Sequence, residues 1–400
     1  MNIPFSPPDI TENEIEAVVE TLRSGWITTG PKTKELESLI ADYVGADHCV
    51  CLNSQTACAE LALCLLKIGE GDEVITSAYT YTATAAVIDH VGAKIVLVDT
   101  QKNSLEMDYE ALEMAITERT KAIIPVDIAG IPCDYDKIFE IVERKKSLFK
   151  PAGAIQSAFG RVVIIADAAH ALGARYNGRA VGSVADFSAF SFHAVKNLTT
   201  AEGGALAWRA IHGISSDEMY REIQVMSLHG QTVDALAKTR MGSWEYDVLG
   251  TYHKCNMTDI AASIGIKQME RYPSMLERRK EIIKKYDAAL KPLGIQVLEH
   301  YTDEIQSSGH LYITRIPGIT AEQRNAIIAK MAECSIACNV HYKPLPMLTA
   351  YKKLGFDISD FPNAYAAYLG EITLPLHTRL TDGQVDYVID NYIRILKEYL

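Results

Sequence analysis

Two residues of opposite charge are placed where they could do chemistry together. Asp167 directly follows a short apolar run, and Lys196 is the only lysine between Lys150 and Lys238. Because α/β sheets bind ligands at the carboxyl ends of their strands, an acid after one strand and a lysine after another could share one site. Pyridoxal phosphate (PLP) needs such a pair: a lysine amine to form a Schiff base, and an acid to keep its ring nitrogen protonated.

Both residues also have structural interpretations. Asp167 could cap a following helix, and Lys196 could lie on a solvated face of the protein. A single acid or lysine is far more often structural than catalytic, because short motifs match by chance. The longer strings around them, ADAAHALGA and FSFHAVKNLTTAEGG, are much more specific.

Strands must bring the two residues to one edge of a sheet. The apolar run at 161–166 is typical of a fully buried strand, and the alternation at 186–192 indicates another. Further strands are expected at 49–52, 74–76, 94–98 and 122–126. Helical stretches separate several of these strands, which predicts βαβ units and a largely parallel sheet.

Helix signals occur throughout the chain. Thr11 and Glu14 form a capping-box pattern that opens a helix at 9–22, and Pro31 suits the first turn of the next helix. Further helices are expected from Thr258 or Asp259 onward, and at 278–290, 321–334 and 382–400.

The 400 residues suffice for a large domain and a smaller one. We expect a large cofactor-binding domain at 1–255 and a smaller domain with linking helices at 256–400. The segment 144–162 reads as a surface insertion whose role the sequence does not reveal. Asn177, Gly178 and Gly182 indicate a loop.

Composition excludes several classes of partner. The net charge of −12 disfavours nucleic acid and anionic membrane surfaces. The chain shows no long uncharged apolar segment and no secretory signal, so we expect no membrane span and a cytoplasmic protein. The eight cysteines form no CxxC pair, so we expect them to be reduced and expect no metal site.

The residues after the strand at 49–52 could bind an anion. Ser54, Gln55 and Thr56 precede a helix of small and apolar residues, and exposed N–H groups at a helix start favour negative charge. An ordinary N-cap by Ser54 or Thr56 explains the same pattern. The sequence contains no Gly-x-Gly-x-x-Gly and no GKT or GKS loop, so neither a dinucleotide nor a nucleoside-triphosphate fingerprint competes for this position.

Taken together, the strings SGWITTGP, ADAAHALGA, FSFHAVKNLTTAEGG and NMTDI resemble the DegT/DnrJ/EryC1/StrS family of PLP-dependent sugar aminotransferases. The resemblance covers almost the whole chain and is closest to members that aminate a 4-keto nucleotide sugar. It implies an α/β protein of PLP fold type I, in which the large domain has a mainly parallel, mixed seven-stranded sheet and the smaller C-terminal domain is also α/β.

The resemblance assigns roles to individual residues. It implies that Lys196 carries the cofactor and moves the proton, that Asp167 pairs with the ring nitrogen, and that Tyr81 stacks on the ring. His170 would lie near the phenolic oxygen, where many members have glutamine. Gln55 replaces a usual glycine in the phosphate loop. The phosphate would be bound by Ser54, Gln55, Thr56, Ser191 and, from the partner subunit of a homodimer with shared active sites, Asn256.

Other interpretations of these residues stay open. Aromatic residues such as Tyr79 and Tyr81 most often pack in a core, and Asn256 could cap the helix that follows it. In the family, substrate-lining loops match the segments that contain Thr28, His229 and His341. As lone residues, His341 and its neighbour Tyr342 are more often structural.

The presence of Lys196 favours transamination, because a related branch has histidine in its place and dehydrates the sugar. L-glutamate would donate the amino group, and a nucleotide-linked 4-keto sugar would accept it. The alternatives are amination at C3 and a PLP-dependent sugar dehydratase. A dinucleotide-dependent oxidoreductase would fit the α/β pattern, but the sequence lacks the glycine fingerprint of that class. A non-catalytic scaffold is also an alternative, and it would tolerate Lys196→Ala.

Overall fold

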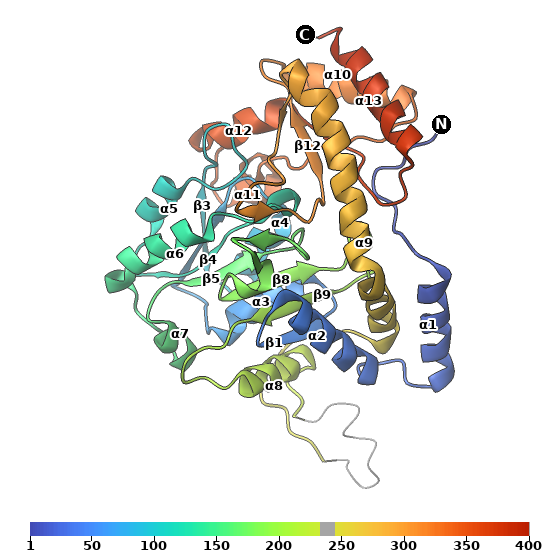
Figure 1. Ribbon diagram of the computed structural model, residues 1–400. Helices are drawn as coiled ribbons and strands as arrows, with labels where there is room; N and C mark the ends of the chain where they lie inside the picture. Colours follow the sequence, from blue (N-terminus) through green and yellow to red (C-terminus); the bar gives the residue numbers. More distant parts are fainter. Residues whose placement is uncertain (233–244, 400) are drawn as a thin grey trace.

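A seven-stranded sheet forms the centre of the computed structural model, which describes residues 1–232 and 245–399 (Figure 1). The strand order is β1-β9-β8-β5-β4-β2-β3. β9 alone runs opposite to the other six strands, so the sheet is mixed but mainly parallel, as the resemblance implies. Its strands are β1 (His48–Leu52), β2 (Glu73–Ser77), β3 (Lys94–Val98), β4 (Thr120–Ile124), β5 (Val163–Asp167), β8 (Phe187–Ser191) and β9 (Gly204–Trp208).

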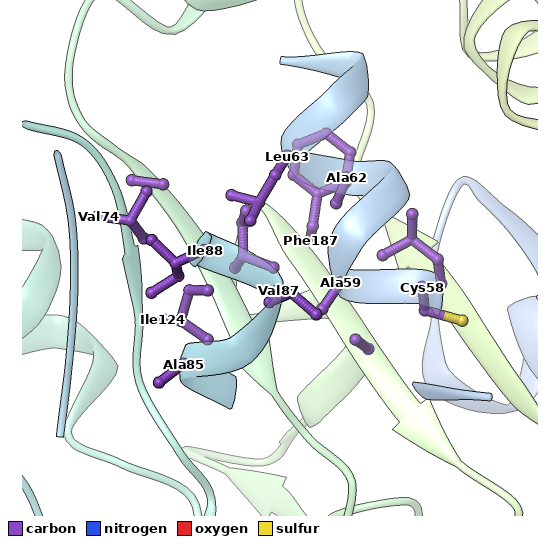
Figure 2. Close-up of a cluster of buried hydrophobic side chains, with 14 of the residues drawn as sticks. Cys58, Ala59, Ala62, Leu63, Val74, Ala85, Val87, Ile88, Ile124 and Phe187 are labelled. Carbon is purple, nitrogen blue, oxygen red and sulfur yellow. The ribbon is translucent and has the colours of Figure 1, made fainter. Parts of the chain in front are cut away.

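Both faces of this sheet are covered by helices, which explains why its strands are continuous apolar runs. Figure 2 shows one face, where the helices α3 (Gln55–Leu65) and α4 (Thr82–His90) pack over Ile124 and Phe187. On the other face a second buried cluster joins the sheet to α2 (Pro31–Val44), α5 (Tyr109–Ala115), α6 (Tyr135–Arg144) and the start of α9 (Asp259–Leu290).

The strand predictions are confirmed within a few residues. The strand expected at 94–98 has those bounds, whereas the one expected at 122–126 begins earlier and ends at Ile124. Pro125 follows Ile124 and has no N–H to donate to the sheet, so the ladder stops there. The loop expected around Asn177 is instead a short hairpin of β6 (Arg175–Tyr176) and β7 (Arg179–Ala180), which pairs with β11 (Ile305–Gln306).

The capping box predicted at Thr11 and Glu14 is present and opens α1 (Glu12–Ser24). The two helices expected at 258–290 are one: α9 has 32 residues and continues through Pro273 (Figure 1). Proline removes one intrahelical hydrogen bond and usually breaks or kinks a helix. The unbroken α9 packs against α1, α2 and the C-terminal helix α13 (Asp382–Leu396).

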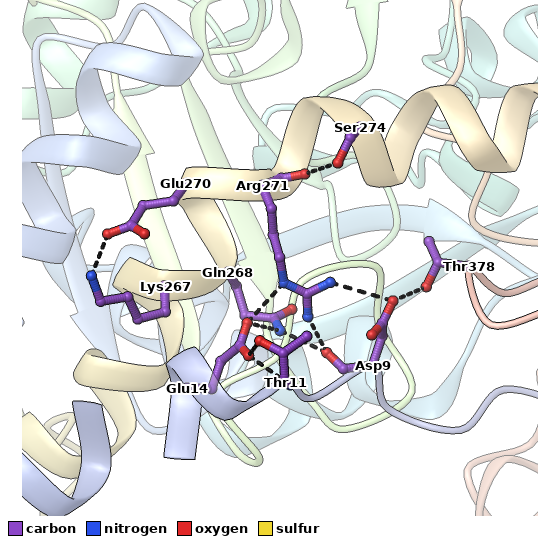
Figure 3. A network of polar contacts seen from close by, with 9 residues as sticks. All are labelled: Asp9, Thr11, Glu14, Lys267, Gln268, Glu270, Arg271, Ser274 and Thr378. Atoms are coloured by element: carbon purple, nitrogen blue, oxygen red, sulfur yellow. Dashed lines mark hydrogen bonds and ion pairs between the residues drawn. The ribbon is translucent and has the colours of Figure 1, made fainter. Parts of the chain in front are cut away.

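A buried polar network holds α1 against α9 (Figure 3). The Glu14 carboxylate accepts hydrogen bonds from Gln268 Nε2 at 2.9 Å and from Arg271 Nε at 2.9 Å. Gln268 also donates to the backbone oxygen of Asp9, whose carboxylate forms an ion pair with Arg271. The N-terminal segment is therefore fixed to the long helix by charge-assisted hydrogen bonds.

The C-terminal part of the chain has its own antiparallel sheet and its own buried cluster. The sheet consists of β10 (Gln296–Val297), β12 (Tyr312–Arg315) and β13 (Glu371–Leu374). The helices α10 (Ala321–Glu333) and α13 contribute apolar residues to this cluster. The division at residues 255 and 256 stays a prediction, since α9 runs from one sheet to the other.

Of the remaining helices, α7 (Ala154–Phe159), α8 (Ser216–Ser227) and α12 (Pro362–Leu369) lie at the periphery (Figure 1). The segment expected as an insertion contains α7, in which buried Gln156 donates to the backbone oxygen of Leu66 at 2.6 Å. No helix among the described residues is both long and apolar enough to cross a membrane. The last of the remaining helices is α11 (Thr349–Lys353).

Candidate active site

A cavity of about 330 Å³ opens at the carboxyl ends of β5 and β8, and a hollow of about 40 Å³ adjoins it. The parallel pairing of β5 and β8 brings Asp167, the last residue of one strand, close to the loop after the other. Asp167, His170 and Lys196 line the hollow. Seven of the residues predicted from the sequence line the cavity: Ser54, Gln55, Thr56, Tyr81, Ser191, Lys196 and His341.

Asp167 is buried, and it does not cap a helix. Its Oδ2 accepts a hydrogen bond from the Thr84 hydroxyl at 2.6 Å, and its Oδ1 accepts one from the N–H of Ala169 at 3.2 Å. Burial raises the pKa of Asp167, while these hydrogen bonds and the charge of Lys196 oppose the rise. A carboxylate held in this way is suited to pairing with a cationic group in the hollow.

Lys196 lies in the turn that follows β8, where its N–H donates to the backbone oxygen of His193 at 2.9 Å. Burial lowers the pKa of Lys196 to about 8, and the charge of Asp167 opposes this shift. The lowered pKa leaves roughly a tenth of the amine unprotonated at pH 7, far more than an ordinary lysine would have. A neutral amine is the form that attacks an aldehyde or accepts a proton.

The N-terminus of α3 forms another wall of the cavity. Ser54 is its N-cap, since its Oγ accepts a hydrogen bond from the N–H of Ala57 at 3.1 Å, as the alternative interpretation expects. Buried Gln55 has a side-chain nitrogen without a hydrogen-bond partner among the described residues. A Cβ on Gly204 would lie 2.5 Å from the backbone nitrogen of Gln55, so the loop packs directly against β9.

The two neighbouring tyrosines have different environments. Tyr79 is buried and donates its hydroxyl proton to the backbone oxygen of His341 at 3.1 Å, so the core interpretation is correct for Tyr79. Tyr81 is 59% exposed, and its ring centroid lies 5.8 Å from that of Tyr342. An exposed aromatic face at a cavity is available to pack against a flat ring.

His170 is a buried histidine whose tautomer the structure defines. Its Nδ1 accepts a hydrogen bond from the N–H of Ala129 at 3.2 Å, and its Nε2 lies 3.2 Å from the Tyr342 hydroxyl. Burial lowers the pKa of His170 well below its ordinary value, so the ring is neutral and Nε2 carries the proton. The Tyr342 hydroxyl oxygen therefore accepts a hydrogen bond from His170 Nε2–H, and the hydroxyl proton of Tyr342 can point elsewhere.

His341 forms part of the wall and is held from two sides. Its ring stacks on Phe5 with centroids 5.4 Å apart, and its Nδ1 lies 2.9 Å from the Thr373 hydroxyl. Burial lowers the pKa of His341 to about 3, so the ring is uncharged at neutral pH. The resemblance places His341 in a substrate-lining segment, although as lone residues His341 and Tyr342 are more often structural; both line the cavity.

Three predicted residues line neither the cavity nor the hollow: Thr28, His229 and Asn256. His229 is exposed, and Asn256 donates its amide proton to the Thr29 hydroxyl. Thr258 caps α9, so the capping interpretation of Asn256 is wrong. The loop that contains Thr28 is held by Asp259, whose carboxylate accepts hydrogen bonds from the backbone nitrogens of Gly30 and Thr33.

Sequence reasoning missed residues that complete the site. Thr84 carries no motif signal, because its contact with Asp167 joins residues 83 positions apart. His193 and Glu202 also line the cavity, with His193 Nε2 and Glu202 Oε1 3.5 Å apart. Both lie within the string FSFHAVKNLTTAEGG, whose density of polar residues is the signal that could have identified them.

The residues present fit PLP. The hollow has a buried acid and a lysine, Tyr81 offers an aromatic face, and the helix start at Gln55 offers N–H groups and an unpaired amide to an anion. No group of three or more metal-ligating side chains occurs at 1–232 or 245–399. The fold and this site together define a PLP-dependent enzyme of fold type I.

Comparison with known proteins gives the family. Residues 8–392 match the DegT/DnrJ/EryC1/StrS aminotransferase family, and the chain belongs to this family. The protein is therefore a PLP-dependent sugar aminotransferase.

Two curated relatives have similar lengths. The spore coat polysaccharide biosynthesis protein SpsC of Bacillus subtilis is 38% identical, over 99% of this chain and 97% of the relative. The UDP-4-amino-4-deoxy-L-arabinose–oxoglutarate aminotransferase of Shewanella sediminis is 38% identical, over 94% and 89%.

The fold is also that of solved structures. Spr1654 of Streptococcus pneumoniae, named as a sugar aminotransferase and solved in its PMP form, is 58% identical over the whole of both chains, with a TM-score of 0.97. PseC of Helicobacter pylori, an aminotransferase of pseudoaminic acid biosynthesis, is 27% identical over the whole of both chains, with a TM-score of 0.87.

Proposed function

We propose that Lys196 and Asp167 are the catalytic pair with which the enzyme transfers the amino group of L-glutamate to a nucleotide-linked 4-keto sugar, such as a 4-keto-6-deoxyhexose. The observation that carries this proposal is that a lysine with a lowered pKa and a buried carboxylate line one hollow at the carboxyl edge of the sheet. The product would be a nucleotide-linked amino sugar for a surface polysaccharide, a glycan or a secondary metabolite, made in the cytoplasm.

PLP, when bound, supplies the electron sink for the substrate carbon that loses its proton. Asp167 would hold the proton on the ring nitrogen, and the Thr84 hydroxyl fixes the orientation of that carboxylate. Lys196 Nζ would take the proton from the substrate carbon and give it back to the carbon on the other side of the amino nitrogen. Tyr81 would pack against the ring, and His170 would lie near its phenolic oxygen.

The phosphate of the cofactor would bind at the start of α3, through Ser54, Gln55 and Thr56, and at Ser191. Asn256 would reach the phosphate of the other subunit in a homodimer, since it lines neither the cavity nor the hollow of its own chain. The exposed apolar residues of α1, Ile15, Val19 and Leu22, support an association between chains.

The sugar nucleotide would enter through the outer part of the cavity. His341 and Tyr342 line the cavity and are held in place by Phe5 and His170. Thr28 and His229 would contribute from loops that a second subunit completes. The curated relative that is named for a 4-amino arabinose sugar supports amination at C4.

The proposal is tested with Lys196→Ala and borohydride reduction. Wild-type protein reduced with borohydride should carry a pyridoxyl label on Lys196. In a separate assay, the untreated wild-type enzyme should release 2-oxoglutarate from glutamate when a 4-keto sugar nucleotide is added. Lys196→Ala should lower this rate by at least about 10³-fold. A label on a different lysine would contradict the proposal, and a deoxysugar formed without 2-oxoglutarate would indicate the dehydratase.

Subunit mixing tests the shared active site. Lys196→Ala and Asn256→Asp should each be inactive alone, because each removes a different part of every site. Refolded together, they should recover about a quarter of the wild-type activity, since a hybrid dimer contains one complete site. A mixture that stays inactive while hybrids form would show that Asn256 acts within its own chain.

A further inference from the structure

A segment from the C-terminal part of the chain, residues 308–310, packs against a turn beside the hollow. The N–H of Ser308 donates to the backbone oxygen of Gly130 at 3.0 Å, and the N–H of His310 donates to that of Ala129 at 3.0 Å. Gly130 has a φ of 85°, and a Cβ there would lie 2.0 Å from Ser308 Oγ. The turn and the segment therefore fit closely only with glycine at this position.

This turn holds His170. The N–H of Ala129 is the group that donates to His170 Nδ1, and the backbone oxygen of His170 accepts a hydrogen bond from the Ser308 hydroxyl. The His310 ring also contacts the His170 ring directly, with centroids 4.3 Å apart. The segment thus fixes both the orientation and the tautomer of His170.

The other side of His310 reaches the residue next to Lys196. Asn197 donates its amide proton to the backbone oxygen of Ser308 at 2.8 Å, so its Oδ1 is the end that faces His310 Nδ1 at 3.0 Å. Because this oxygen can only accept, His310 Nδ1 carries the proton and donates it. All of these groups are buried.

The segment is itself held by α9. Buried Arg279 donates through Nη1 to the backbone oxygens of Gly309 at 3.2 Å, His310 at 3.3 Å and Leu376 at 3.0 Å. These charge-assisted hydrogen bonds fix the backbone of the segment relative to the long helix. A ring carried on so constrained a backbone has little freedom to follow movements of its neighbours.

We propose that His310 is a positioning residue for the cofactor hollow: it holds the Lys196 turn through Asn197 and holds His170 by direct ring contact. The proposal rests on the proposed function, since it takes Lys196 as the residue that carries PLP. It adds a buried contact from the C-terminal part of the chain to a site formed by the large sheet. The other titratable groups that face Lys196 are Asp167, His170 and His341.

The test compares three variants of the PLP-loaded enzyme. His310→Phe keeps a ring against His170 but leaves Asn197 Oδ1 without a donor, whereas His310→Asn offers an amide N–H in place of Nδ1–H. His300→Phe is the matched control, because His300 is also buried and bonded through Nδ1, to Ser307 at 2.9 Å, but lines neither the hollow nor the cavity. The readouts are PLP affinity and the pH midpoint of the visible absorbance of bound PLP.

In His310→Phe the Lys196 turn should loosen and admit water, which favours the cationic form of the lysine–PLP linkage. We expect the absorbance midpoint to rise by roughly half a pH unit and PLP to bind about fivefold more weakly. His310→Asn should restore most of the midpoint, and His300→Phe should leave both quantities unchanged. A wild-type midpoint and affinity in His310→Phe, or equal changes in His300→Phe, would overturn the proposal.

If His310→Phe does not fold, Asn197→Ala takes its place, with the same expected rise and the same contrary outcome. Borohydride labelling of the wild type separates the two levels of inference. A label on another lysine would end both the proposed function and this inference. A label on Lys196 together with an unchanged absorbance midpoint in His310→Phe would contradict only the proposed role of His310.

Discussion

Burial and local contacts determine the protonation states of Asp167, His170 and Lys196 in the hollow. Burial raises the pKa of Asp167 and the Thr84 hydrogen bond lowers it, whereas burial is the largest cause of the lowered pKa of both Lys196 and His170. Such opposed shifts in one small space are characteristic of catalytic sites. Thr84 lines neither the cavity nor the hollow, so its hydrogen bond to Asp167 can be removed by substitution without changing a residue that lines the site.

Thr84→Val should shift the acid limb of the pH–rate profile. The hydroxyl favours the ionised form of Asp167, so its loss raises the pKa of Asp167 and the carboxylate takes up a proton at higher pH. We expect the acid limb of kcat to move up by roughly 0.5 to 1 pH unit. Thr76→Val is the control, because its buried hydroxyl donates to the backbone oxygen of Ile124 and lines no cavity; an equal shift there would contradict this explanation.

At the scale of elements, the site depends on the contact between the start of α3 and strand β9. Gly204 allows this contact, because β9 approaches the backbone of Ser54 and Gln55 too closely for a side chain. A proposed phosphate site made of backbone N–H groups needs those groups in fixed positions. A substitution at Gly204 therefore tests the proposed phosphate site without changing any side chain of Ser54, Gln55 or Thr56.

Gly204→Ala should weaken PLP binding by about tenfold or more, because the added methyl group must push the start of α3 away from β9. Equilibrium dialysis of the cofactor, or its fluorescence, measures the effect. Gly383→Ala is the matched control, since nothing lies within 4 Å of the Cβ that it adds. Unchanged PLP affinity in a folded Gly204→Ala protein would show that the start of α3 does not bind the cofactor.

For the whole molecule, α9 is the element that connects the N-terminal segment, the large sheet and the C-terminal sheet. Burial disfavours ionised Glu14, but hydrogen bonds from Thr11 and Arg271 outweigh it and lower the pKa of Glu14. The side chain of Glu14 is 1% exposed, so removal of Arg271 would leave a buried carboxylate with too few partners.

Arg271→Met should lower the free energy of unfolding by about 2 to 4 kcal/mol at pH 7. A lowered pKa stabilises the folded protein above the unfolded value, near 4.3 for glutamate, and this contribution is lost as the pH falls. The difference between variant and wild type, measured by urea unfolding, should therefore shrink below about pH 4. Lys267→Met removes an exposed ion pair with Glu270 from the same helix and should cost less than about 0.5 kcal/mol. Equal losses in both variants would show that the buried network adds nothing.

Local patterns in the sequence were sufficient for much of this architecture. The strand at 94–98, the capping box of Thr11 and Glu14 and the helix start at Pro31 depend on residues within one or two turns of each other. The strings around Asp167 and Lys196 likewise identified the two residues that the parallel pairing of β5 and β8 brings to one hollow.

Only the tertiary structure decided what joins these pieces. The sequence indicated a break where α9 continues through Pro273, because the packing that accompanies the unbroken helix comes from elements distant in the chain. Thr84, Tyr342 and His310 were not predicted as site residues, since their contacts with Asp167, His170 and Asn197 span 83 to 172 positions. Hydrophobic period and capping act over a few residues, so they determine the elements of this protein, whereas the path of the folded chain determines which of their side chains meet.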